Sequence, residues 1–242
     1  MALFLATTSG KGGVGKSSVS AGLGFAFSAL KQKVLLVDMD EGLRCLDLFL
    51  GLDDKTVLDL GDALTANDIN DIAYSAKPEG LFLIPAPERV GEINPEDLKR
   101  FAKKADSLFD VVIFDFPAGL NFTLYSALPR DTVFLGVATP DPVSVRDVAM
   151  ASEKLHELGL NSRLIINRFD LKEHKKRHLS SIDGIINDSS LQLLGIIPEG
   201  KDINLLSIKH KLKKNGRPIK AFLRIAGRLQ YKNIPLMKLK KI

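Results

Sequence analysis

Cysteine is almost absent from this chain of 242 residues, in which Cys45 stands alone. One cysteine excludes an internal disulfide, and it excludes a metal or iron–sulfur site built from two or more cysteines of a single chain. Long apolar runs are missing as well: no stretch without a charged residue exceeds 14 residues, too few for a membrane-spanning helix. The apolar N-terminus is short and carries no basic leader, so we expect no signal peptide and a cytoplasmic location.

Acidic residues are scarce at one end of the chain. Residues 201–242 contain 13 lysines and arginines and one aspartate, a net charge of +12, whereas residues 1–200 have a net charge of −7. This asymmetry points to a polyanionic partner, either nucleic acid or an anionic membrane, with a solvated basic helix as the alternative. Hydrophobic residues at 45% and charged residues at 26% are ordinary for a globular protein, which excludes disorder, collagen and coiled coil as descriptions of the whole chain.

Short apolar runs alternate with helical stretches along the chain. The runs are continuous in hydrophobicity, which is typical of strands covered on both faces of a parallel sheet; they lie at 2–7, 33–38, 80–85, 110–115, 132–138, 162–167 and 191–197. The helical stretches lie at about 16–30, 56–64, 95–106, 142–158, 178–187, 202–210 and 218–232. This alternation predicts an α/β fold with a doubly wound, mostly parallel sheet. We expect one domain over residues 1–232 and a short basic tail at 233–242.

Residues 10–17 read GKGGVGKS, which fits the phosphate-loop pattern G-x-x-x-x-G-K-[ST] between a predicted strand and a predicted helix. Glycines let consecutive backbone N–H groups approach phosphate oxygens, and the helix that follows presents free N–H groups to the same anion. The Lys16 ammonium would lie over the β- and γ-phosphates, and the Ser17 hydroxyl would bind Mg²⁺. The predicted nucleotide contacts are Gly10, Lys11, Gly12, Gly13, Val14, Gly15, Lys16, Ser17 and Ser18.

Three aspartates follow predicted strands. Asp38 and Asp115 end the apolar runs VLLV and VVIF, and Asp40 lies just beyond the first of them. Ligands of open α/β sheets bind at the carboxyl ends of strands. Since Mg²⁺ keeps several waters and takes one or two carboxylates beside phosphate oxygens, we expect Asp38 and Asp115 to join its shell together with Ser17. A helix cap or a turn is the alternative for each aspartate.

A lysine at each end of the loop, Lys11 and Lys16, makes the sequence resemble the deviant Walker A ATPases of the MinD/ParA family. The resemblance is closest to MinD and covers nearly the whole chain, including DMDEGLR at 38–44, FDFPAG at 114–119, TPDPVSVRD at 139–147, LLGIIPEG at 193–200 and NGRPI at 215–219. It implies a phosphate-loop NTPase that uses ATP and Mg²⁺, forms a homodimer in its ATP state and hydrolyses ATP slowly. On the resemblance, Lys11 reaches the phosphates of the facing subunit, Lys16 acts within its own subunit, and Asp40 orients the attacking water.

Two residues depart from the pattern of the family. Phe116 follows Asp115 where the family usually has a small polar residue, which predicts the loss of a polar contact and a change in hydrolysis rate more than in binding. Glu41 replaces a usually apolar residue beside the first switch segment.

Residues 167–170, which read NRFD, bear on which nucleotide base the site would bind. This segment superficially matches the guanine-reading motif N-K-x-D, but Arg168 replaces the lysine. In the family that the chain resembles, the equivalent strand end contacts adenine, which implies base contacts from Asn167 and Pro198. We therefore expect ATP rather than GTP.

Several functions share such a site. The resemblance favours a MinD-like switch that recruits a regulatory protein partner and positions the division site at the membrane. A ParA-like ATPase that segregates DNA and a regulator of flagellar number are the alternatives. An electron carrier of the nitrogenase iron-protein type needs two cysteines per chain, and this chain has one.

The last predicted helix carries basic residues that would contact the polyanion. Its basic residues recur every four positions and would form one outward stripe, consisting of Lys220, Arg224, Arg228 and Lys232. Its apolar residues would dock on the core: Ile219, Phe222, Leu223, Ala226 and Leu229. The stripe predicts weak, salt-sensitive contact with an anionic membrane or with DNA, and the resemblance to MinD favours the membrane at the inner face of the cell. The tail is shorter than a usual interfacial anchor.

Overall fold

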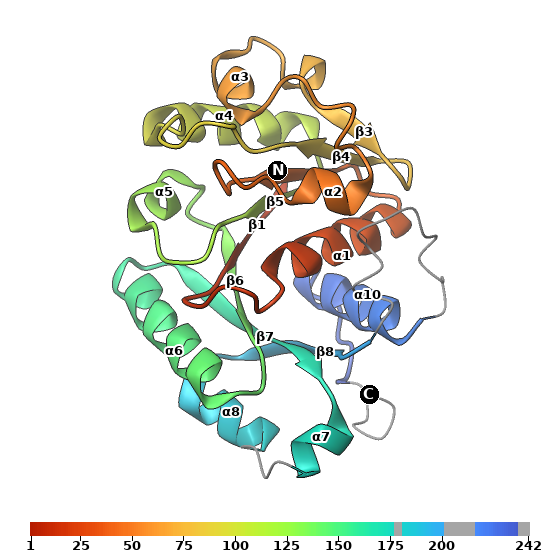
Figure 1. Ribbon diagram of the computed structural model, residues 1–242, viewed down its shortest axis with the longest axis vertical. Helices are drawn as coiled ribbons and strands as arrows, with labels where there is room; N and C mark the ends of the chain where they lie inside the picture. The colour runs from red at the N-terminus through yellow and green to blue at the C-terminus, as the bar shows by residue number, and fades with distance from the viewer. Residues whose placement is uncertain (177–180, 201–215, 237–242) are drawn as a thin grey trace.

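The computed structural model describes residues 1–176, 181–200 and 216–236, and it is built on one eight-stranded sheet (Figure 1). The strand order is β3-β4-β2-β5-β1-β6-β7-β8. The strands are β1 (Leu3–Thr8), β2 (Val34–Asp38), β3 (Tyr74–Ala76), β4 (Leu81–Ile84), β5 (Val111–Asp115), β6 (Val133–Ala138), β7 (Asn161–Phe169) and β8 (Leu193–Pro198). All neighbouring pairs are parallel except β3 with β4. The predicted fold class is therefore confirmed.

Helices cover both faces of this sheet, as a doubly wound fold requires. One face packs against α1 (Lys16–Ala29), α2 (Leu46–Leu50) and α10 (Arg217–Leu229). The other packs against α3 (Leu60–Thr65), α4 (Pro95–Leu108), α5 (Phe122–Ala127), α6 (Pro142–Glu157) and α8 (Ile182–Ser189). Two short helices, η1 (Ile69–Asp71) and α7 (Leu171–Lys176), complete the described elements. No helix in the described ranges is long and apolar enough to cross a bilayer.

Every predicted strand is present, with ends that differ by no more than two residues. The predicted helix at 56–64 begins instead at Leu60, because Asp59 forms a capping box with Asp62 and thereby fixes the first turn. The sequence prediction lacked β3, α2, α5, η1 and α7, which are short and carry little periodicity. The predicted helix at 202–210 lies outside the described residues, as do residues 237–242 of the tail.

Helix α10 docks on the core by its apolar residues, as predicted. Ile219, Phe222, Ala226 and Leu229 are buried, whereas Leu223 is only partly buried. Phe222 packs directly onto α1 at Gly22, where a Cβ atom would lie 2.3 Å from the Phe222 ring. The absence of a side chain at Gly22 is therefore what allows these two helices to pack closely.

The predicted outward stripe on α10 is wrong for its two arginines. Arg224 donates a hydrogen bond to the Pro235 carbonyl at 2.8 Å. Arg228 donates to the carbonyls of Ile234 at 2.7 Å and Leu194 at 2.6 Å. Leu194 is the extra residue of a β-bulge, which leaves its carbonyl out of the β7–β8 ladder. The arginines thus bind the chain's own backbone, and Lys220 and Lys232 are the members of the stripe that stay exposed.

Candidate nucleotide-binding site

The predicted phosphate loop connects β1 to α1 at the carboxyl end of the sheet (Figure 1). Gly13 and Gly15 have φ angles of 78° and 90°, in the left-handed region that glycine adopts without strain. Gly15 is the N-cap of α1 and contributes no side-chain cap, so the first N–H groups of the helix remain available to an anion. A Cβ atom on Gly15 would lie 2.5 Å from the Asn167 amide nitrogen, which excludes larger residues there.

The Lys16 side chain is buried in this loop, with only 7% of the residue exposed. Its ammonium donates to the Ser9 hydroxyl at 3.0 Å, and that hydroxyl donates to the Lys11 carbonyl at 2.7 Å. Burial lowers the pKa of Lys16, and the negative charges of Asp115 and Asp40 oppose this effect. A buried cation is costly unless it is paired, so the position of Lys16 suits an anionic ligand.

Asp38 and Asp115 are directly opposite one another on the neighbouring strands β2 and β5. Each belongs to the alternate set of residues that faces α1, since Leu36 and Ile113, two positions earlier, pack in the core on that side. Both carboxylates are buried, Asp38 at 0% and Asp115 at 1% exposure. The structure therefore brings together the two aspartates that the sequence predicts as neighbours of Mg²⁺.

Hydroxyl groups hold the Asp115 carboxylate. The Thr7 and Ser20 hydroxyls each donate to Asp115 Oδ1 at 2.7 Å, and Ser17 also donates to this carboxylate. Burial nevertheless raises the pKa of Asp115, because three neutral donors do not replace full hydration of the charge. Thr7 and Ser20 were not predicted from the sequence; a threonine pair ending an apolar strand is the signal that could have identified Thr7.

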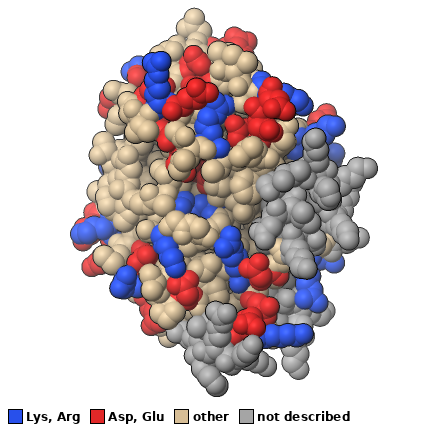
Figure 2. Space-filling model, in the orientation of Figure 1, with Lys and Arg blue, Asp and Glu red and all other residues tan. Residues whose placement is uncertain are grey.

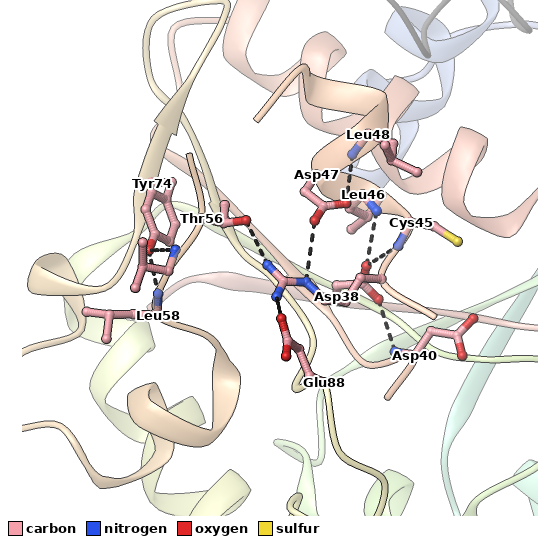
Figure 3. A network of polar contacts seen from close by, with 12 residues as sticks. Asp38, Asp40, Cys45, Leu46, Asp47, Leu48, Thr56, Leu58, Tyr74 and Glu88 are labelled. Carbon is pink, nitrogen blue, oxygen red and sulfur yellow. Dashed lines mark hydrogen bonds and ion pairs between the residues drawn. The ribbon is translucent and has the colours of Figure 1, made fainter. Parts of the chain in front are cut away.

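Backbone N–H groups hold the Asp38 carboxylate (Figure 3). Oδ1 accepts from Asp40 at 3.0 Å, and Oδ2 accepts from Cys45 at 2.9 Å and Leu46 at 3.0 Å. Burial, followed by repulsion from Asp115, raises the pKa of Asp38 to about 7 despite these bonds. Two buried carboxylates that repel one another beside a hydroxyl group are a donor set suited to a hard divalent cation, so the residues present fit Mg²⁺.

Asp40 lies just beyond β2 in the segment that links this strand to α2 (Figure 3). It is partly buried, and burial raises its pKa while the charge of Lys16 opposes the shift.

Phe116 points away from this site. Its ring packs edge-on against Tyr125, with 4.7 Å between ring centroids, and the residue is only 2% exposed. Because successive residues of a strand face opposite sides, the residue after Asp115 faces the α4 and α5 layer. A polar side chain at this position would therefore be buried in the core and would not reach the site, so the predicted loss of a polar contact with the site does not follow from Phe116.

Of residues 167–170, Asn167 contacts the phosphate loop. The Asn167 amide donates to the Val14 carbonyl at 2.8 Å, while its Oδ1 atom is buried without a hydrogen-bond partner in the described parts of the chain. Asp170 instead caps α7, because its Oδ1 accepts from the N–H groups of Lys172 at 2.7 Å and Glu173 at 3.3 Å. Pro198 pairs with Phe169 at the end of β8.

Lys11 contacts a residue of its own chain. Its ammonium lies 3.5 Å from Asp141 Oδ1, and both side chains are more than one third exposed. Exposed ion pairs contribute little to stability, so this contact leaves Lys11 free to change partners.

Comparisons with known proteins agree with this geometry. The model of the CobQ/CobB/MinD/ParA nucleotide binding domain matches residues 5–213. The septum site-determining protein MinD of Thermotoga maritima is 32% identical over an alignment that covers 98% of this chain and 91% of that protein. Among solved structures, a chain of the MinC:MinD cell division protein complex of Aquifex aeolicus is similar with a TM-score of 0.86 at 28% identity, covering 98% of this chain and 99% of that one. MinD of Pyrococcus horikoshii, complexed with Mg-ADP, gives a TM-score of 0.80 at 25% identity over 95% of this chain and 96% of that one.

Proposed function

The chain belongs to the CobQ/CobB/MinD/ParA family of nucleotide-binding domains and is related to the septum site-determining ATPase MinD, and on this basis we propose that it is an ATP-driven, Mg²⁺-dependent dimeric switch for intracellular positioning, most specifically of the division site. The observation that carries the proposal is the burial of Lys16, Asp38 and Asp115 around one glycine-rich loop. Three buried charges are costly in a structural role and are explained by a charged ligand that binds among them.

Each proposed role follows from the position of a side chain. The loop glycines and the first N–H groups of α1 bind the phosphates, and Lys16 compensates their charge. A bound Mg²⁺ ion would supply neutralisation of negative charge on the phosphates. Ser17, Asp38 and Asp115 would hold this ion, in part through waters. Asp40 would orient the attacking water, since phosphoryl transfer depends mainly on positioning and charge neutralisation.

The unpaired Asn167 oxygen supports adenine as the base. A buried acceptor without a partner is costly, and the exocyclic amino group of adenine would satisfy it. The carboxylate that would read guanine in an N-K-x-D motif, Asp170, is used to cap α7 instead. We therefore propose ATP rather than GTP as the nucleotide, with Pro198 beside the base.

Lys11 supports the dimeric state. Its weak contact with Asp141 can be exchanged for the phosphates of a facing subunit without a large loss of stability. The MinC:MinD complex of Aquifex aeolicus shows that a related chain binds a second protein, which supports a regulatory partner for this chain as well.

Nucleotide titration followed by hydrolysis measurement tests the switch. Lys16→Ala should remove ATP binding, whereas Asp40→Ala should keep binding and lose turnover. Lys11→Ala should keep monomeric binding and lose both dimerisation and hydrolysis, while the exposed control Lys55→Ala should leave all three unchanged. Tighter binding of GTP than of ATP would refute the base assignment, and an Asp40→Ala protein that remains monomeric with ATP in light scattering would refute the dimer.

Fewer basic residues are available for contact with a polyanion than the sequence predicts. On the face shown in Figure 2, basic and acidic side chains are intermixed over the described residues. Since Arg224 and Arg228 bind backbone carbonyls, we propose that Lys220, Lys232 and the tail provide the contact, and that it is a weak association with the inner face of the membrane. Sedimentation with anionic vesicles and with duplex DNA tests this choice. Membrane association is supported if the wild-type chain pellets with vesicles and the Lys220→Glu and Lys232→Glu variants do not. Binding to DNA alone favours the ParA-like alternative.

A further inference from the structure

The carboxylate of Glu41 accepts three backbone hydrogen bonds from a segment fifty residues away. Its Oε1 atom lies 3.1 Å from the Gly91 nitrogen, 2.8 Å from that of Glu92 and 3.0 Å from that of Ile93. Successive N–H groups that converge on one oxygen form an anion-binding nest, and bonds to a charged acceptor are the stronger kind. Glu41 therefore joins the segment after β2 to the segment before α4.

The nest is joined directly to a capped helix. Ile93 is 8% exposed and packs in the core with α4. Asn94 caps this helix by accepting from the Glu96 N–H at 2.9 Å, and Pro95 fixes the first helical position. The backbone that binds Glu41 is thus held by a helix of 14 residues.

The segment that Glu41 anchors needs such support. Gly42 and Leu43 are exposed, and Leu43 is 72% accessible. Gly42 donates to the Pro87 carbonyl at 2.9 Å, and the Arg44 guanidinium pairs with Glu88 at 3.3 Å on the same neighbouring segment. Glu88 itself is 80% exposed, so this ion pair contributes little. The Glu41 bonds are therefore the principal tie between the two segments.

Asp40 immediately precedes Glu41. On its other side its own N–H is bound to Asp38 Oδ1 at 3.0 Å. The backbone of Asp40 is consequently fixed between the sheet edge and the α4 anchor. Fixing the residues that flank a catalytic group reduces the entropy lost when that group is aligned for reaction.

We propose that Glu41 is a positioning residue that holds Asp40 in its reactive place by binding the backbone N–H groups of residues 91–93. The inference rests on the proposed function of Asp40. It also explains a departure from the family pattern, because an apolar residue at position 41 has no acceptor for these three N–H groups.

Two measurements on the purified full chain test the proposal. In hydrogen–deuterium exchange of the nucleotide-free protein, Glu41→Leu should accelerate exchange of the 91–93 amides by about tenfold or more, given the strength of bonds to a charged acceptor. In single-turnover hydrolysis with saturating Mg²⁺ and ATP, the same variant should be slowed about tenfold, while its ATP dissociation constant changes less than about twofold. Glu41→Gln keeps an oxygen acceptor and should recover most of both properties.

The control is Glu79→Leu, which makes the same exchange of residue types at an exposed position far from the segment, and it should behave as wild type in both assays. Unchanged amide exchange at 91–93 in Glu41→Leu would overturn the tie itself. Faster exchange with a wild-type hydrolysis rate would overturn the positioning role. A wild-type chain that binds no ATP would instead refute the proposed function, and the exchange assay distinguishes that failure from the others.

Discussion

Raising the pH should destabilise the nucleotide-free, Mg²⁺-free protein across the neutral range. Burial, followed by repulsion from Asp115, raises the pKa of Asp38 to about 7, whereas an unfolded aspartate titrates near 3.8. Between these values the folded protein binds the proton and the unfolded chain does not, so stability falls as the pH rises through this window. About three pKa units at about 1.4 kcal/mol each give a total loss on the order of 4 kcal/mol, about half of it between pH 5 and pH 7.

Urea unfolding at pH 5, 6, 7 and 8 with EDTA measures this loss in wild type and in Asp38→Ala. The variant should be less stable overall, because three backbone N–H groups lose their acceptor. Its stability should nevertheless fall less steeply with pH, because the proton that the folded state retains is gone. Asp115, whose pKa burial also raises, leaves a residual slope of the same sign.

Parallel pH profiles for wild type and Asp38→Ala would refute the reasoning. Addition of Mg²⁺ and ADP supplies a second check, because a divalent cation beside Asp38 and Asp115 favours their ionised forms. Most of the fall in wild-type stability with pH should then disappear. In the Asp38→Ala variant, the pH dependence of stability should change little on the same addition.

Two further predictions concern packing around the site. Gly22→Ala places a methyl group 2.3 to 2.6 Å from three atoms of the Phe222 ring. Overpacking between α1 and α10 should therefore lower stability by about 1–3 kcal/mol and lower the Tm. A Tm equal to that of wild type would contradict this prediction. Tyr125→Phe removes the 2.9 Å hydrogen bond between the Tyr125 and Thr8 hydroxyls and should cost about 1 kcal/mol in urea unfolding, while Phe122→Leu, which removes a neighbouring ring contact, is the comparison for loss of packing alone.

The parallel strands and the phosphate loop were predictable because local sequence dictates them. Continuous apolar runs form strands buried on both faces, and the spacing of glycines, Lys16 and Ser17 has few structural uses other than phosphate binding. The pairing of Asp38 with Asp115 also follows, since both end parallel strands of one sheet. The direction of the Phe116 side chain could have been predicted too, from strand alternation beside Asp115.

The contacts of charged side chains with distant backbone could not be predicted. Periodicity places Arg224 and Arg228 on one face of a helix, but it does not reveal that residues 234 and 235 return to cover that face. The sequence around Glu41 likewise gives no sign of its hydrogen bonds. Its partners are determined by the position of the segment before α4 in the fold. Formation of a short strand such as β3, which pairs with β4, depends on the same tertiary arrangement.

The hydroxyl contact of Tyr125 gives the molecule an optical property. The chain contains no tryptophan and three tyrosines, so tyrosine emission is not lost by energy transfer to an indole ring. Tyr231 is 96% exposed, whereas Tyr125 is fully buried and bonded to Thr8, the residue that precedes Ser9 and the phosphate loop. A ligand that moves the end of β1 alters this bond and with it the emission of a single buried fluorophore. We expect nucleotide binding at the proposed site to change the intrinsic fluorescence of the unlabelled chain, with Tyr125→Phe as the blank.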